Sequence, residues 1–110
     1  MAGMTAKLDD DQIAELAEMF RMMGDQSRLG ILLACMAAPV SVGDIAERLG
    51  LSPSLVSHHL RLLRAARILR AERRGKQVFY SAVDEHIRRV ITDMVDHVAE
   101  PVDGGAEGAP

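Results

Sequence analysis

The sequence is poor in aromatic residues and in cysteine: its 110 residues include no tryptophan, one tyrosine, two phenylalanines and one cysteine. So few aromatic rings leave little surface on which single-stranded bases or sugars could stack. A single thiol excludes a disulfide framework within the chain and is typical of a reducing cytoplasm. The sequence therefore favours a cytoplasmic protein that is neither a carbohydrate binder nor a disulfide-stapled domain.

Long apolar runs are also absent. The longest, residues 31–40, is interrupted by Pro39 and is too short to span a bilayer. No apolar segment precedes the acidic residues 9–11, so we expect neither a signal peptide nor a membrane partner. The length predicts a single domain with a modest core, and association between two chains would bury more apolar surface.

The net charge of −3 hides a strong asymmetry along the chain. Residues 51–80 contain seven basic side chains and one acidic side chain, whereas the rest of the chain contains 6 basic and 15 acidic groups. A basic third within an acidic protein indicates a binding surface for a polyanion.

The apolar pattern predicts five helices and one β-hairpin between a flexible N-terminal arm, residues 1–8, and a disordered tail, residues 101–110. The first helix is expected at residues 10–23, with an apolar stripe formed by Ile13, Leu16, Ala17, Phe20 and Met23. Asp25 is a natural N-cap for a second, largely buried helix that reaches about Ala38 and ends at Pro39.

Two short helices follow, joined by a tight turn at Gly50. Ser41 caps the first, which has Asp44 at the capping-box position and presents Ile45, Ala46 and Leu49 inward. Ser52 caps the second, Pro53 takes the first helical position, and Val56, Leu60 and Leu63 face inward. This arrangement predicts a helix-turn-helix.

The next segment, "ILRAERRGKQVFYSAV", predicts two strands around a basic turn. A basic hairpin after a helix-turn-helix is typical of a wing. The predicted fold is therefore mainly α with a β-hairpin wing: a homodimeric winged helix-turn-helix whose DNA-binding and dimerisation domain covers residues 9–100.

The second helix of the pair carries a polar stripe opposite its leucines, at a spacing that places its members on one helix face. Its members are Ser54, Ser57, His58 and Arg61. A helix of this size fits the major groove of double-stranded DNA, and Arg61 is the best candidate for a base contact because a guanidinium pairs bidentately with guanine. We expect the remaining basic side chains, Arg64, Arg73, Arg74 and Lys76, to hold the phosphate backbone. Ser52 caps the helix and, together with Ser54, can also bind phosphate. Apart from the place of His58 in the polar stripe, we interpret His58 and His59 as ordinary helix surface. The weaker alternative is that the pair binds a metal.

The closing segment, "DEHIRRVITDMVDHVAE", predicts an amphipathic helix with two histidines eleven residues apart. At about 100° per residue His86 and His97 lie within about 20° of the same face, beside an apolar stripe, but a rise of about 1.5 Å per residue separates them by roughly 16 Å. Zinc–nitrogen bonds are near 2 Å, so one ion cannot bind both on a single helix.

Two copies of this helix packed antiparallel would bring the separated ligands together. Asp84 and His86 of one chain would then meet His97 and Glu100 of the other, at both ends of the helix pair. Two nitrogens and two carboxylate oxygens suit tetrahedral zinc or cobalt, and the dimer would present two recognition helices to a palindromic operator. The alternative is an N-cap and two histidines at the edge of a dimer helix, and on spacing alone both stay open.

Over roughly residues 10–100 the sequence, above all "SVGDIAERLGLSPSLVSHHLRLLRAARILRAERRGKQVFYSAVDEHI", resembles the ArsR/SmtB family of bacterial metal-responsive transcriptional repressors. The Asp-x-His and His-x-x-Glu pattern resembles the C-terminal-helix zinc site of its SmtB- and CzrA-like members, and it falls on Asp84, His86, His97 and Glu100 without a gap. The resemblance implies that the metal-free dimer represses an efflux or sequestration gene and that metal binding lowers its DNA affinity. It also implies that His97 donates its other ring nitrogen to a backbone carbonyl near Arg67, which would couple the metal site to the recognition helix.

The sequence also departs from other members of the family. Arsenic, cadmium and lead sensors place thiolates in the first helix of the helix-turn-helix, where this chain has Ser41-Val42-Gly43-Asp44. We interpret Cys35 as a core residue, with a redox or metal role left open. The sequence after Glu100 has no histidine or cysteine, which argues against a six-coordinate nickel site, although nickel stays an alternative.

The sequence thus predicts a zinc-responsive, or cobalt-responsive, repressor and not an enzyme, because a closed four-ligand site leaves no position for a reactive water. A repressor responding to nickel or another signal, and a DNA-binding dimer with purely structural zinc, are the alternatives. A metal-dependent hydrolase would need an open coordination position and a substrate pocket, and the sequence indicates neither.

Overall fold

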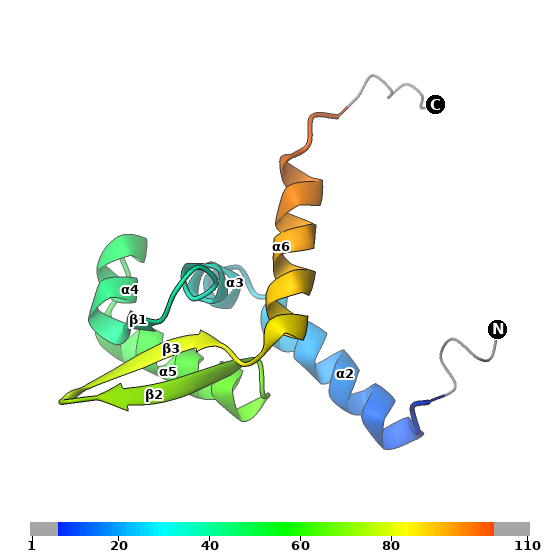
Figure 1. Ribbon diagram of the computed structural model, residues 1–110, viewed down its shortest axis with the longest axis horizontal. Coiled ribbons are helices and arrows are strands. Elements are labelled where there is room, and N and C mark those ends of the chain that lie inside the picture. The colour runs from blue at the N-terminus through cyan, green and yellow to red at the C-terminus, as the bar shows by residue number, and fades with distance from the viewer. Residues whose placement is uncertain (1–6, 103–110) are drawn as a thin grey trace.

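The computed structural model describes residues 7–102, so positions 1–6 of the expected arm and 103–110 of the expected tail lie outside the described residues. The described chain contains five helices and a three-stranded antiparallel sheet (Figure 1). The elements in order are α2 (Asp10–Met23), α3 (Gln26–Ala34), β1 (Val40–Ser41), α4 (Val42–Leu49), α5 (Pro53–Ala65), β2 (Leu69–Arg74), β3 (Gln77–Ala82) and α6 (Glu85–Ala99).

The first helix, α2, begins as its sequence predicts. Asp9 and Gln12 form a reciprocal capping box, in which each side chain accepts a hydrogen bond from the other residue's backbone amide, at 2.8 and 3.0 Å. Only Met22 and Met23 of α2 are buried, so most of the predicted apolar stripe lies outside the core. Asp25 caps α3 by accepting from the amide of Arg28 at 3.0 Å.

The predicted end of the second helix is wrong: α3 stops at Ala34, four residues before Ala38 and well before Pro39. Its last turn tightens, because the amides of Cys35 and Met36 donate to carbonyls three residues earlier. The freed carbonyl of Met36 then accepts a hydrogen bond from Nε of Arg88 in α6, at 3.1 Å. A long-range contact therefore takes the place of a further helical turn.

Helices α4 and α5 form the predicted helix-turn-helix. Ser41 and Ser52 cap them, and Gly50 between them has φ +69°, the left-handed conformation that glycine adopts without strain. Three side chains of α5 are fully buried: Val56, Leu60 and Leu63. The prediction for α4 is correct for Ile45 and Ala46 but wrong for Leu49, which is 37% exposed.

The wing is a hairpin of β2 and β3, closed by a turn at Gly75 and Lys76. A third strand, β1, which the sequence pattern did not indicate, adds Val40 and Ser41 to the other side of β3. The strand order is therefore β1-β3-β2. The short β1 therefore connects the start of α4 to β3 of the wing.

The core lies between α3, α4, α5 and the base of the sheet, and Cys35 is one of its fully buried residues, as predicted. Helix α6 starts beside this core and then extends away from it (Figure 1). Asp84 caps it, and Ile91 is its single buried residue. No helix of the described chain is long and apolar enough to cross a membrane. The mainly helical winged helix-turn-helix is confirmed.

Candidate nucleic-acid interface and metal half-sites

The polar stripe of α5 is available to a ligand. Ser54, His58 and Arg61 are exposed, and Ser57 is half-buried. Ser52 Oγ accepts the amide of Leu55 at 3.1 Å and lies 3.4 Å from Ser54 Oγ, so its first role is the helix cap. The exposed groups are hydrogen-bond donors and acceptors on one face of a helix, the chemistry that reads base edges and holds phosphates.

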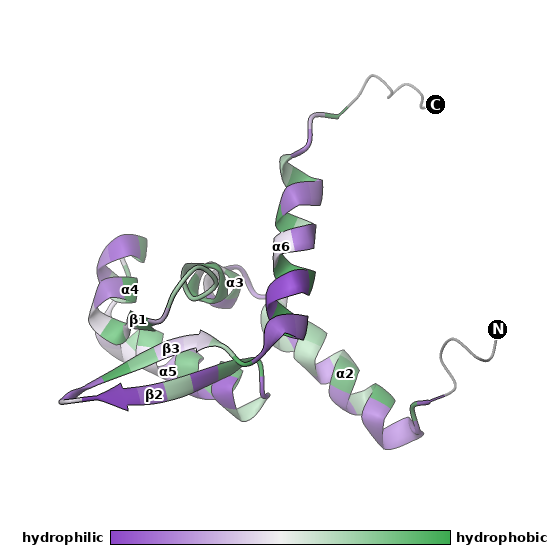
Figure 2. Cartoon of the chain, viewed as in Figure 1, coloured by the Kyte–Doolittle hydropathy of each residue, from purple (hydrophilic) through white to green (hydrophobic). Residues whose placement is uncertain are grey.

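The basic side chains of the wing differ in whether they form an ion pair. Arg74 is held by Glu72, with Nη2 to Oε1 at 3.2 Å, and its guanidinium lies 5.1 Å from the centre of the Phe79 ring. Arg73 and Lys76 are exposed and form no ion pair within residues 7–102. The hairpin extends from the body of the molecule on the side away from α6, and its tip is hydrophilic (Figures 1 and 2).

His59 is a feature that sequence reasoning treated as ordinary surface. Its Nδ1 is buried and has no hydrogen-bond partner in the described chain. Burial lowers the pKa of His59, and the positive charge of Arg28 lowers it further, while Asp25 acts in the opposite direction. His59 is therefore an uncharged packing residue between α5 and the start of α3. His58 is 5.7 Å away ring to ring, and within residues 7–102 no three potential metal ligands come together.

Asp84 and His86 form a pair at the start of α6. Asp84 accepts the amide of Ile87 at 3.1 Å, and its other oxygen lies 3.6 Å from Nδ1 of His86. The bond from the Ile87 amide, with a smaller contribution from His86, lowers the pKa of Asp84, so the carboxylate is ionised at neutral pH. The His86 side chain is 89% exposed and Asp84 is 52% exposed, so both are open to a ligand.

His97 lies in the last turn of α6, and Glu100 is its C-cap. The four predicted ligands are therefore divided between the two ends of one helix, and one chain does not bring them together. The donor chemistry of the complete set, two imidazoles and two carboxylates, fits a zinc-like ion. Each end of α6 supplies half of that set.

A cavity of about 420 Å³ opens beside Asp84 and His86, and Met19, Arg67, Val83 and Ile87 line the rest of it. Arg67 follows the end of α5 and has φ +62°, a left-handed conformation that is unfavourable for arginine. Its Nη2 lies 3.6 Å from Oε2 of Glu15 in α2. No hydrogen bond joins His97 to Arg67 within the single chain described, so the coupling through Arg67 stays a prediction for the dimer.

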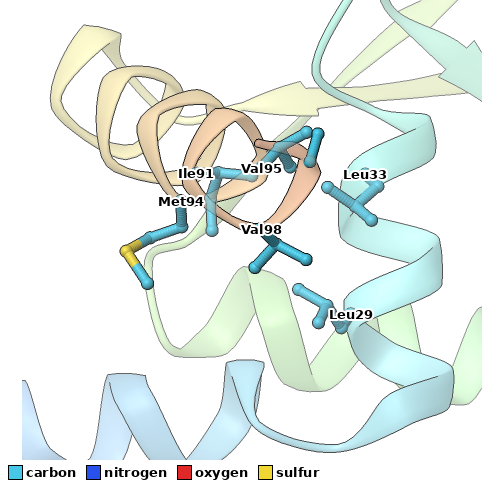
Figure 3. A pocket seen from close by; sticks show the side chains of 7 residues that line it. Leu29, Leu33, Ile91, Met94, Val95 and Val98 are labelled. Carbon is cyan, nitrogen blue, oxygen red and sulfur yellow. The ribbon is translucent and has the colours of Figure 1, made fainter. Parts of the chain in front are cut away.

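The apolar face of α6 is largely exposed. Val90 and Val95 are 44% exposed, Met94 is 55% exposed and Val98 is 78% exposed. Together with Leu29 and Leu33 of α3, this face forms an open groove with an apolar lining (Figure 3). Ile13, Leu16 and Phe20 of α2 add a second exposed apolar stripe, between 43 and 57% exposed. So much apolar surface on a small domain marks an interaction site.

Comparison with known proteins is consistent with these features. The model of a family described as bacterial regulatory proteins of the arsR family matches residues 25–71, which include the helix-turn-helix. The HTH-type transcriptional regulator KmtR of Mycobacterium tuberculosis is 39% identical over 88 residues, covering 80% of this chain and 68% of KmtR. The HTH-type transcriptional regulator NmtR of the same organism is 33% identical over 93 residues, covering 84% of this chain and 78% of NmtR.

Solved structures agree with the fold. The solution structure of apo-NmtR superimposes with a TM-score of 0.74 at 31% identity, covering 96% of this chain and 89% of that one. A homodimeric winged helix-turn-helix DNA-binding domain from Mycobacterium bovis, at 24% identity, gives a TM-score of 0.73 and covers 86% of this chain and 90% of its own. At 24% identity, the Mycobacterium bovis structure supports the fold alone.

Proposed function

Because the chain belongs to the ArsR family of bacterial regulatory proteins, we propose that it is a homodimeric repressor that leaves its operator DNA when zinc binds between the subunits. The family consists of transcriptional regulators, so the chain is not an enzyme. The observation that carries the finer proposal is the division of four metal-ligand side chains between the two ends of α6. We assign the regulator to the cytoplasm, with residues 9–100 as one DNA-binding and dimerisation domain.

The DNA contact is made by α5 and the wing. The stripe of Ser54, Ser57, His58 and Arg61 enters the major groove, where Arg61 contacts a base. Ser52, Arg64, Arg73, Arg74 and Lys76 hold phosphates. Since β1 ties the wing to the start of α4, both elements approach the duplex in a fixed relation. Arg74 must first loosen its pair with Glu72 to reach a phosphate, which makes Arg73 and Lys76 the stronger wing contacts.

The dimer forms through the apolar faces of α6 and α2. A second copy covers the groove between α3 and α6 and removes the exposed valines and methionine from water. When the two-fold axis of the dimer crosses α6 near its middle, the two copies of α6 run antiparallel, so the C-terminal end of one approaches the start of the other. Asp84 and His86 then share an ion with the partner copy's equivalents of His97 and Glu100. Two recognition helices related by a two-fold axis suit a palindromic operator.

The donor set favours zinc, with cobalt next. Two imidazoles and two carboxylates complete a tetrahedron, whereas soft ions need thiolates. The first helix of the helix-turn-helix has Ser41 instead of a thiolate, and Cys35 is fully buried, with burial raising its pKa to about 12. Nickel, which prefers more ligands, is the alternative.

The release of DNA requires only that zinc binds one dimer conformation better than the other. A tenfold loss of DNA affinity corresponds to a coupling free energy of about 1.4 kcal/mol. Relief of repression at metal efflux or sequestration genes would follow. A structural role for zinc is the alternative, in which the ion holds the dimer together without changing its affinity for DNA.

The test is a zinc titration of the purified dimer with the anisotropy of a labelled operator as the readout, on the wild-type protein and on His97→Ala. We expect zinc to weaken DNA binding by the wild-type protein at least tenfold and to leave His97→Ala unaffected. A His58→Ala variant, tested for zinc binding alone, is the matched control because it removes an exposed imidazole on α5 instead of one on α6. Unchanged DNA affinity with zinc bound would contradict the switch, and dissociation of the dimer on chelation would favour the structural role.

A further inference from the structure

We propose that Glu72 competes with the DNA backbone for Arg74 and so lowers the affinity of the wing for DNA of any sequence. The inference rests on the proposed function, because it concerns the wing of that DNA-binding dimer, and it names a residue that limits the contact. Glu72 is the only acidic side chain among residues 51–80, which carry seven basic ones. A lone carboxylate within a surface that meets a polyanion opposes binding.

The pairing of β2 with β3 puts Glu72, Arg74 and Phe79 on one face of the wing. Glu72 lies opposite Phe79 in the register. Arg74 lies opposite Gln77, so its long side chain is a diagonal neighbour of the Phe79 ring. Side chains alternate between the two faces of a strand, and the buried Leu69 points to the other face. Arg74 and Glu72 are 51% and 54% exposed, so their face of the wing is open to a ligand.

The guanidinium of Arg74 is held from two directions. Its Nη2 donates to Oε1 of Glu72 at 3.2 Å, and its central carbon lies 5.1 Å from the centre of the Phe79 ring. A DNA phosphate and the Glu72 carboxylate are both anions, and each forms a charge-assisted hydrogen bond with a guanidinium. Contact of Arg74 with DNA therefore exchanges one anionic partner for another.

The other two cations of the wing gain a phosphate without giving up a partner. Arg73 and Lys76 form no ion pair within the described part of the chain. An exposed ion pair is worth only a factor of about 1.4 to 5 in an equilibrium constant, so Glu72 restrains Arg74 without locking it. A two-fold dimer carries two wings, so the restraint counts twice. Because phosphates carry no sequence information, it weakens binding to operator and to random sequence alike.

The experiment measures binding of the metal-free dimer to a labelled DNA duplex of random sequence over a series of salt concentrations. It compares the wild-type protein with Glu72→Gln, Arg74→Gln and the double variant. At low salt we expect Glu72→Gln to bind about three- to tenfold more tightly, and the slope of log affinity against log salt concentration to steepen by up to about 1. In the Arg74→Gln background the same change should strengthen binding by less than about twofold, because no guanidinium is left to release.

Glu18→Gln is the matched control, because it makes the same change of charge in another exposed pair. Glu18 contacts Arg21 at 2.7 Å on α2, about 160° around that helix from Phe20 of the apolar stripe. We expect this variant to bind the duplex within about 1.5-fold of the wild-type protein, since its charge lies outside the wing.

Two results would overturn the competition. The first is a Glu72→Gln variant that binds DNA as the wild-type protein does. The second is a gain that persists in full in the Arg74→Gln background, which would mean that Glu72 repels the phosphates directly. Either result leaves the proposed function in place, provided that zinc releases the wild-type dimer from its operator. Failure of that release would contradict the zinc switch and leave the competition standing, whereas a wild-type dimer that binds no DNA would overturn both.

Discussion

Replacing Val98 by aspartate is the most direct test of the dimer interface. Val98 is 78% exposed on the last turn of α6, beside His97, and it lines the apolar groove that α3 completes (Figure 3). Among residues 7–102 little covers it, so we expect the substitution to leave the fold of a single chain intact. In a two-fold dimer both copies of the side chain lie in the interface, and each change counts twice.

The magnitude follows from the exposed fraction. Complete burial of a valine contributes about 1.5–3 kcal/mol, so covering four-fifths of it contributes about 1–2.5 kcal/mol per copy. Two copies then contribute about 2–5 kcal/mol to dimerisation, before the added cost of removing two carboxylates from water. We expect Val98→Asp to raise the dimer dissociation constant at least about 100-fold, which corresponds to about 2.7 kcal/mol.

Sedimentation equilibrium over a range of protein concentrations measures this constant directly. Thr92→Asp is the control, because it adds the same charge about 120° around α6 from Val98, where the exposed threonine hydroxyl donates only to carbonyls of its own helix. Circular dichroism of the variants confirms that α6 is still helical. A dimer of unchanged strength in Val98→Asp would refute the assignment of this face to the interface.

Two further predictions concern α5 and the wing. Because the pKa of His59 is lowered in the folded protein, the unfolded state binds more protons below about pH 6.5, and stability falls as the pH falls through that range. In His59→Leu the urea midpoint should change less between pH 7.5 and 5.5 than in the wild-type protein. An equal change would contradict a half-buried, neutral imidazole. In fluorescence titrations with DNA, Arg61→Ala should reduce the preference for operator over random sequence. Arg73→Ala should weaken binding to operator and to random sequence equally, and should lower the slope of log affinity against log salt concentration by about 1. The reverse pattern would exchange the roles of the two arginines.

The parts of the fold that the sequence predicted are those set by local chemistry. Ser41, Ser52 and Pro53 mark helix starts through interactions within one turn, and Gly50 marks a stop because it takes a positive φ. Each of these residues acts on the backbone only a few positions away, so a single sequence suffices to locate the helix starts and the stop. The helix-turn-helix and the wing were correctly predicted on that basis.

The parts that sequence reasoning missed depend on distant partners. Helix α3 ends at Ala34, and just beyond it the carbonyl of Met36 accepts a hydrogen bond from Arg88, 52 positions away. Strand β1 exists because Val40 pairs with Tyr80. Leu49 is exposed although the helical pattern points it inward. The same limit applies to the proposed metal site: helix rise shows that its candidate ligands are apart, but the surface that would bring them together belongs to a second chain.

The anchoring of α6 gives the two half-sites different roles in the proposed dimer. Arg88 and Ile91 fix the first half of α6 to the core in which Leu60 and Leu63 of α5 are buried, so the start of α6, with Asp84 and His86, is held against the same core as α5. Beyond Ile91 the helix is exposed, and the position of His97 and Glu100 is set by whatever the outer half packs against. An ion shared between one chain's fixed half-site and the other chain's outer half-site therefore binds best at one relative position of the two subunits. DNA selects a relative position of the same subunits through its half-site spacing, and the two ligands oppose each other when those positions differ.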